Sequence, residues 1–309
     1  MTKIATMTPT PSSLPALDGK FARLALAALL GGAAATGFTP IFVRLGELDP
    51  SATGFWRLGL ALPVLWLLSS FEGRPTRLPR QTTNRSYYSW LVAAGLFFAG
   101  DVAIFNWSLN FTAVANASLL ANSAPIFVAL GAWLFLGERF KRIFLVGLAV
   151  ALLGATILIG ASFKVGLEYL FGDFLALLTA IFYAGYILSI QQLRRHVTAT
   201  TTMIGSGLIT GAALLALTFL SGERLIALTL QGWLALVGLA LVSHVSGQGM
   251  ITYALAHLPA SFSSVSLLMQ PVVATILAWF ILQEPLGLWQ AGGGLIILAG
   301  IFLARRGSP

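Results

Sequence analysis

Residues 115–139 read ANASLLANSAPIFVALGAWLFLGER, and residues 260–285 read ASFSSVSLLMQPVVATILAWFILQEP. The two stretches share a proline, a tryptophan and a glutamate at one constant offset of 146 residues: Pro125 and Pro271, Trp133 and Trp279, and Glu138 and Glu284. The same offset relates Gly147 to Gly293 and Gly154 to Gly300. A shared pattern of this kind is hard to obtain by chance, so the chain contains two copies of one unit.

The composition is that of a membrane protein. Of the 309 residues, 57% are hydrophobic and only 9% are charged, whereas soluble domains carry about 25% charged residues. There is no cysteine, which excludes disulfides, zinc-thiolate sites, iron–sulfur clusters and cysteine nucleophiles. Residues 1–18 are polar, contain three prolines and have no apolar signal core. We interpret them as a disordered cytoplasmic tail.

Ten apolar stretches are each long enough to cross a bilayer, which takes roughly 20 residues of helix. They cover residues 21–43, 51–71, 88–111, 115–136, 143–161, 173–190, 199–220, 231–252, 262–282 and 287–304. These stretches are too long for barrel strands, and none alternates between polar and apolar residues. We therefore predict an all-α integral membrane protein with ten transmembrane helices.

The basic residues predict the orientation of the chain. With the N-terminus in the cytoplasm, 14 of the 18 Lys and Arg residues fall on the cytoplasmic side, as the positive-inside rule requires. This distribution explains the net charge of +8 as a topology signal, so no nucleic-acid partner is expected. We expect a multi-pass protein of the bacterial inner membrane with both termini in the cytoplasm.

Each copy of the repeat contains five helices, an odd number, so the second copy is inverted in the membrane. We place the first copy at residues 19–161 and the second at residues 172–305. Glu138 is followed by three basic residues within four positions, whereas no basic residue follows Glu284 until Arg305. We interpret both glutamates as loop and capping residues on opposite membrane faces. Inverted repeats allow two pseudo-symmetric states that open to opposite sides, as in secondary transporters.

The repeated motif resembles the EamA-type signature of the drug/metabolite transporter superfamily. The matching residues are Pro125, Trp133, Gly137-Glu138-Arg139, Gly147 and Gly154, and again Pro271, Trp279, Glu284, Gly293 and Gly300. The resemblance covers roughly residues 20–305 and is greatest to bacterial aromatic amino-acid exporters of the YddG type. It implies two inverted five-helix repeats around a central cavity, lined mainly by the first, third and fourth helices of each repeat. The second copy departs from the motif with Gln283-Glu284-Pro285 in place of Gly-Glu-Arg.

Three ionisable residues fall inside the predicted helices, where charge is costly and usually functional. Asp101 lies near the middle of the 88–111 helix, and Arg57 lies about 9 Å below the outer end of the 51–71 helix. The two could form a buried ion pair; alternatively, Asp101 carries a proton or binds a substrate amino group. His244, with Gln248 one turn further on, is either a packing residue or part of a substrate or proton site. No second ligand stands at metal-binding spacing, so no metal site is predicted.

Uncharged polar and aromatic residues cluster on the helices that the resemblance places around the cavity. The candidates for substrate contact are Asn106, Trp107, Asn110, Asn122, Tyr183, Tyr186, His244, Gln248 and Gln270. Each could instead make an interhelical hydrogen bond, worth about 0.6–2 kcal/mol in a bilayer. As a set they predict a polar patch in a largely apolar cavity, which suits a zwitterion with a large apolar side chain.

Pro125 and Pro271 lie in the middle of predicted helices at symmetry-related positions. Each removes a backbone hydrogen bond and favours a kink, so we predict that both act as hinges. The glycines of these and neighbouring helices either serve tight helix packing or assist such bending.

The sequence carries no Walker loop and neither a G-x-S-x-G nor an H-E-x-x-H motif, which argues against ATP-driven transport and hydrolase chemistry. We predict a secondary transporter that exports aromatic or large neutral amino acids by alternating access. The alternatives are an exporter of other small metabolites or lipophilic cationic drugs and, more remotely, an intramembrane enzyme. We expect no cofactor, a small-molecule substrate and the lipid bilayer as partners, and a monomer.

Overall fold

The computed structural model describes residues 19–71, 85–160, 166–283 and 287–308. Within these ranges every regular element is helical, and ten helical spans are long and apolar enough to cross a membrane. The spans are Phe21–Leu45, Pro50–Phe71, Tyr87–Ser108, Asn116–Leu136, Arg142–Gly160, Leu167–Arg194, Ala199–Leu220, Leu230–Ala254, Ala260–Leu282 and Leu288–Gly307. The predicted all-α fold with ten membrane helices is therefore confirmed.

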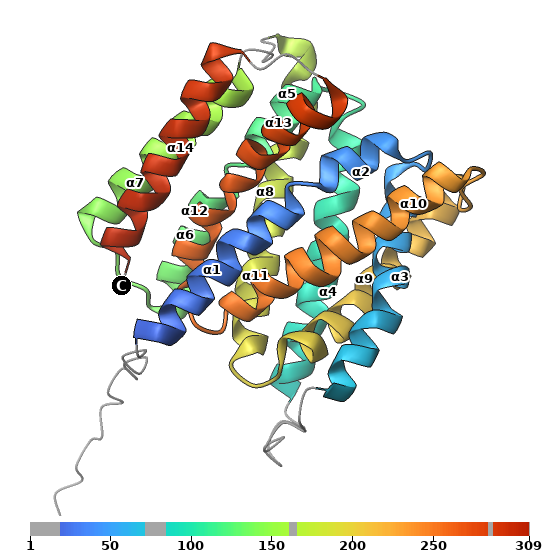
Figure 1. Cartoon of the computed structure of the whole chain (residues 1–309), viewed down its shortest axis with the longest axis horizontal. Helices are drawn as coiled ribbons and strands as arrows, with labels where there is room; N and C mark the ends of the chain where they lie inside the picture. Colours follow the sequence, from blue (N-terminus) through green and yellow to red (C-terminus); the bar gives the residue numbers. More distant parts are fainter. Residues whose placement is uncertain (1–18, 72–84, 161–165, 284–286, 309) are drawn as a thin grey trace, which may run out of the picture.

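The ten spans form two halves of five. The first half consists of α1 (Gly19–Thr36), α2 (Thr39–Leu45), α3 (Pro50–Phe71), α4 (Arg85–Ser108), α5 (Val114–Ala121), α6 (Ala124–Leu136) and α7 (Arg142–Gly160). The second consists of the 3₁₀ turn η1 (Leu167–Tyr169), α8 (Leu170–Arg194), α9 (Ala199–Leu220), α10 (Leu230–Gly238), the π-helix η2 (Leu239–Gln248), α11 (Gly249–Ala254), α12 (Ala260–Leu267), α13 (Met269–Leu282) and α14 (Leu288–Gly307). Because five is odd, the second half runs through the bundle in the opposite sense, as an inverted repeat (Figure 1).

The two spans that contain the repeated prolines are each divided into two helices. Asn122 and Ser123 separate α5 from α6, and Leu268 separates α12 from α13. Each break precedes Pro125 or Pro271 by two or three residues, because proline lacks an N–H group and its ring clashes with the preceding turn. The backbone at both breaks stays in the right-handed helical region, so these spans are kinked and not unwound. A hinge function for the two prolines stays a prediction.

The final spans of the two halves, α7 and α14, pack as an antiparallel pair (Figure 1). Glycines at seven-residue spacing line the contact on both helices: Gly147 and Gly154 on α7, and Gly293, Gly300 and Gly307 on α14. A methyl group on Gly300 would lie 2.3 Å from the backbone nitrogen of Ala151, and one on Gly147 would lie 2.2 Å from that of Ala304. Small residues let helix backbones approach closely in a bilayer, where apolar burial alone does not drive association.

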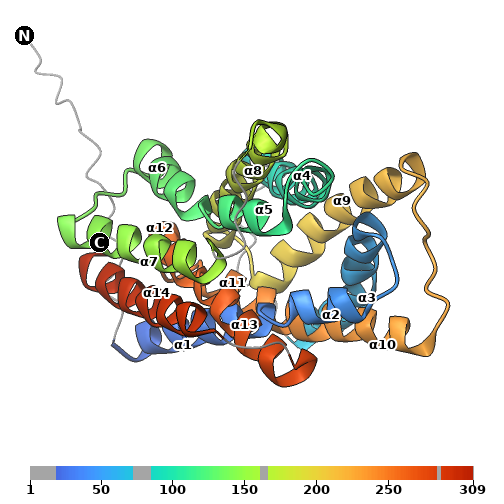
Figure 2. The ribbon, with the colours of Figure 1, turned by 90° about the horizontal axis from the view of Figure 1, so that it is seen from above.

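The other eight spans surround the centre of the molecule. Helix α4 packs against α8 and α9, α3 packs against α9 and η2, and α1 packs against η2 and α11. Figure 2 shows α4, α5, α6 and α8 along one side of the bundle and α1, α13 and α14 along the other. The fully buried side chains of Leu29, Ile187 and Ile251 belong to one continuous core that joins the two halves.

Candidate substrate cavity

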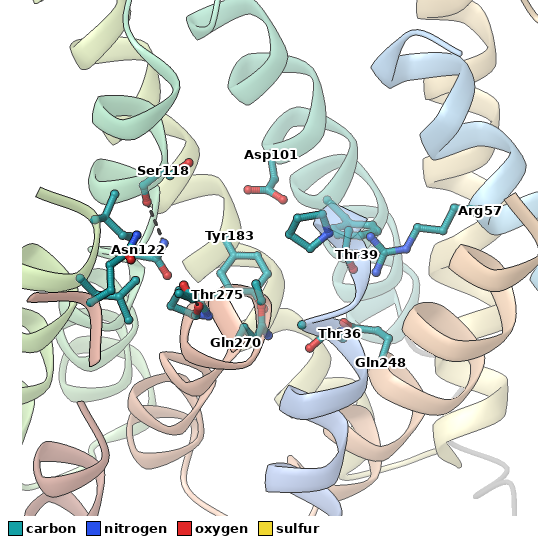
Figure 3. Close-up of a pocket in the computed structure, with 18 residues that line it drawn as sticks. Thr36, Thr39, Arg57, Asp101, Ser118, Asn122, Tyr183, Gln248, Gln270 and Thr275 are labelled. Atoms are coloured by element: carbon teal, nitrogen blue, oxygen red, sulfur yellow. Dashed lines mark hydrogen bonds between the residues drawn. The ribbon is translucent and has the colours of Figure 1, made fainter. Parts of the chain in front are cut away.

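A cavity of about 690 Å³ lies between the two halves (Figure 3). Its volume falls in the range of small-molecule sites, about 300–1,000 Å³. We call the end of the bundle that carries Gly19 and Gly307 the termini end and the opposite one the far end. The lining runs from the middle of the spans towards the far end, where Ile159 lies in the last turn of α7 and Gln290 in the first turn of α14.

Arg57 from α3 and Asp101 from α4 bring opposite charges into this cavity (Figure 3). Of the two alternatives, the buried ion pair is not seen, because these two described side chains form none. Arg57 Nε is buried without a hydrogen-bond partner, and the guanidinium carbon lies 5.9 Å from the centroid of the Phe98 ring. The guanidinium thus packs near the residue one turn before Asp101 on α4, and the Asp101 carboxyl group forms no ion pair with it.

Aromatic and amide side chains form the wall beside the two charges. Gln248 Nε2 donates a hydrogen bond to the Tyr186 hydroxyl at 2.9 Å, and the Tyr186 ring stacks on Phe98 with centroids 4.7 Å apart. Tyr183, one turn earlier on α8, lines the cavity together with Gln270 (Figure 3). Because Gln248 lies in the π-helix η2, the wall includes backbone of a kind that is common at functional sites.

Four of the nine predicted contact residues line the cavity. Those that line it are Asn122, Tyr183, Gln248 and Gln270, together with Arg57, Asp101 and Pro271. Tyr186 and His244 are buried, each 3% exposed, and are not part of the lining. His244 Nδ1 has no hydrogen-bond partner. Pro125 is buried on α6 away from the lining.

Three predicted contact residues on α4 and in the turn after it lie elsewhere. Asn106 is displaced by about 140° around the helix from Asp101, at ~100° per residue, and does not line the cavity. Asn110 lies beyond the end of α4 at Ser108, is exposed and does not line the cavity either. Trp107 is 57% exposed, and its ring packs against Phe111. The helix face that carries Asp101 therefore contributes to the cavity, and the opposite face does not.

Several lining residues were not among the predicted contacts. Thr36 ends α1 and Thr39 begins α2, on either side of the break between these helices. Gly37, inside this break, and Pro40, just after it, were the sequence features that could have pointed to these two lining residues. Thr275 and Gln290 also line the cavity. The sequence could not predict this, because a single polar residue in an apolar span shows no periodicity that marks the face towards the cavity.

Contacts between the two halves close the termini end. Glu138 follows α6, and its carboxylate accepts hydrogen bonds from the backbone N–H of Ala260 at 3.3 Å and from the Ser261 hydroxyl. These residues begin α12, so Glu138 caps a helix N-terminus in the other half, where a negative charge is favoured. Nearby, Gln191 Nε2 donates to the carbonyl of Leu258 at 3.4 Å. The matching Glu284 lies outside the described residues.

The protonation of Glu138 should affect the stability of this closure. Burial raises the pKa of its carboxyl group, and the hydrogen bonds from Ser261 and from the backbone of Ala260 oppose that shift. A raised pKa means that the closed structure favours the protonated group. Its contribution to stability is therefore fully present below the usual pKa of about 4.3 and is lost as the pH rises through the raised value.

We expect Glu138→Gln, which resembles the protonated carboxyl, to have a higher Tm than the wild type at pH 8. The difference should shrink as the pH falls towards 5. Glu138→Ala loses the cap and should cost about 1–2 kcal/mol at pH 5; this cost should shrink as the pH rises, because the wild type itself loses stability there. Thermal unfolding in detergent across this pH range measures both effects, with Glu168→Gln as a control at an exposed carboxylate. A Tm difference that widens as the pH falls would contradict the assignment.

The chain is similar to known transporters over most of its length. The model of the EamA-like transporter family matches it twice, at residues 23–160 and 170–306. The pseudopaline exporter CntI of Pseudomonas aeruginosa is 31% identical over 254 residues, which cover 81% of this chain and 84% of that protein. An uncharacterized transporter of Archaeoglobus fulgidus is 28% identical over 278 residues, covering 85% of this chain and 91% of its own length.

A solved crystal structure supports the fold. It matches with a TM-score of 0.74 at 21% identity and covers 90% of this chain and 98% of that chain. The relatives named above do not confirm the narrower resemblance to aromatic amino-acid exporters. They and the two family matches do establish a multi-pass membrane transporter. The chain belongs to the EamA-like transporter family.

Proposed function

We propose that this transporter exports a small zwitterionic metabolite of the amino-acid type. The observation that carries the proposal is the presence of Arg57 and Asp101 in one cavity without an ion pair between them. A guanidinium group presents a planar fork that fits a carboxylate, and a carboxylate accepts charge-assisted hydrogen bonds from an ammonium group. A zwitterion would therefore compensate for both buried charges and leave the net charge of the cavity unchanged.

The uncharged lining supports the same class of substrate. Phe98 and Tyr183 offer ring surface to a large apolar or aromatic side chain, and Asn122, Gln248 and Gln270 offer amide donors and acceptors. A dianion such as a sugar phosphate fits poorly, because Arg57 is the sole basic residue in the described lining. We infer that large neutral or aromatic amino acids are the best match.

The proposal of export by alternating access is argued from which end of the cavity is closed in this structure. The cavity lining extends towards the far end, and the Glu138 cap closes the termini end. If the termini lie in the cytoplasm of a bacterial cell, as the basic residues predict, this is the outward-facing state. Inverted repeats offer a pseudo-symmetric inward-facing counterpart, in which the substrate would enter from the cytoplasm.

Counterflow of labelled phenylalanine in proteoliposomes tests the substrate class. We expect saturable flux that other neutral amino acids compete for. The panel should include pseudopaline, which the Pseudomonas relative is named for exporting, and a lipophilic quaternary cation. Saturable flux of the cation alone, with none for any amino acid, would overturn the proposal. It would favour drug export, the second candidate, which the unpaired Asp101 carboxylate supports. Repeating the flux with a pH gradient tests whether protons move with the substrate.

A further inference from the structure

A second hollow of about 620 Å³ lies on the surface of the bundle between α6 and α7. Its apolar walls are formed by Ile126, Ala129, Leu130 and Trp133 of α6, at the spacing of one helix face, and by Leu145 and Leu148 of α7. Leu130 and Trp133 are 49% and 56% exposed, within a span that crosses the membrane. We call this hollow the α6–α7 groove; it faces lipid.

The depth of the groove matches one leaflet of a bilayer. From Leu136, where α6 ends, to Ile126 the helix rises about 15 Å at ~1.5 Å per residue. This is half of the hydrocarbon core, which is about 30 Å thick. The groove therefore runs from the membrane surface at the termini end to the middle of the membrane, which is the reach of one acyl chain.

Positive charge gathers where the groove meets the membrane surface. Arg139 lines the groove. Lys141, in the connection to α7, and Arg142, the first residue of α7, also have exposed side chains. Glu138, which would weaken this field, is engaged with α12 instead. Helix α7 begins at Arg142, so its partly positive N-terminus lies at the same level.

The second repeat provides an internal comparison. Trp279 matches Trp133, but the positions that match Arg139, Lys141 and Arg142 are Pro285, Gly287 and Leu288. The positive-inside rule accounts for a basic connection at the termini end. The positive-inside rule does not explain why an apolar groove, as deep as one leaflet of the bilayer, ends at Arg139.

We propose that the α6–α7 groove binds one anionic phospholipid, with an acyl chain between α6 and α7 and the phosphate group at Arg139 and Lys141. An anionic headgroup complements the three cations, and the chain covers apolar surface that no protein segment covers in the described structure. This site is separate from the substrate cavity and does not depend on the identity of the substrate.

Native mass spectrometry of the full-length, delipidated protein tests the site. Phosphatidylglycerol and phosphatidylcholine with identical chains are titrated in parallel. We expect one tightly bound phosphatidylglycerol and a weaker, non-saturating signal for phosphatidylcholine. Arg139→Gln should weaken phosphatidylglycerol binding about fivefold, the effect of one cation at a membrane surface. Leu130→Trp fills the groove from an exposed position and should weaken binding of both lipids.

Two matched variants separate the groove from general effects. Arg195→Gln removes an exposed cation at the same end, and Leu134→Trp enlarges an exposed residue of α6 outside the groove. Both should bind phosphatidylglycerol like the wild type. Equal binding of the two lipids, or equal losses in Arg195→Gln and Arg139→Gln, would overturn the proposal. So would a dimer that Leu130→Trp converts to a monomer, because a second copy would then occupy the groove.

Discussion

Replacing Gly293 with alanine should prevent α7 and α14 from packing, whereas the same replacement at the adjacent Gly292 should be harmless. A methyl group on Gly293 would lie 2.6 Å from the backbone nitrogen of Leu158 and 2.8 Å from the carbonyl oxygen of Gly154. Backbone atoms cannot rotate out of the way as a side chain can, so the helices would have to separate. We expect a loss of about 3 kcal/mol, the upper end of the usual cost of overpacking.

Gly292 provides the control on the same turn of the same helix. A methyl group there meets no atom within 4 Å, and alanine is favoured over glycine in a helix by roughly 0.5–1 kcal/mol. Gly292→Ala should thus keep or raise the Tm. The yield of monodisperse protein and its Tm in detergent measure both variants. Equal stability of Gly292→Ala and Gly293→Ala would show that the close contact of α7 and α14 is not required.

The second large effect is expected on substrate binding. Arg57→Gln and Asp101→Asn should each raise the Kd of a zwitterionic amino acid by about 10- to 100-fold, because hydrogen bonds to charged groups contribute about 1.5–3 kcal/mol. Binding to the purified protein by calorimetry measures the change. Asn110→Ala, at an exposed position in the turn after α4, should bind like the wild type.

Ligands that lack either the carboxylate or the ammonium group test which charged group of the substrate contacts Arg57 and which contacts Asp101. Phenylalaninamide has no carboxylate, so Arg57→Gln should not weaken its binding further. Phenylpropionate has no ammonium group, so Asp101→Asn should not weaken its binding further. The opposite pattern, or an equal loss for every ligand in both variants, would mean that the two side chains support the fold and do not bind substrate.

The membrane spans and their kinks could be predicted because they depend on local properties of the sequence. Apolar length alone identifies a span, and the lack of an N–H group at Pro125 and Pro271 breaks each helix within a few residues. The faces of the spans could not be predicted in the same way. Both the lipid and the protein interior are apolar, so α4 shows no periodicity that would place Asp101 towards the cavity and Asn106 away from it.

Contacts between distant parts of the chain could not be predicted from the sequence either. Arg57 and Asp101 lie on consecutive spans, which suggested a pair, but the position of the guanidinium depends on packing against Phe98. Glu138 was interpreted as a capping residue. Its partner is α12 in the other repeat, 122 residues away, and no local pattern points to that contact.

The glycine contact between α7 and α14 also constrains how the molecule can move. Backbone meets backbone from Gly147 and Ala304 at one end to Gly154 and Ile297 near the other, so this edge cannot open without losing its contacts. An exchange between outward- and inward-facing forms that keeps this contact has to move α7 and α14 together as one body, so the rearrangement would fall on the contacts that the other spans make between the two halves.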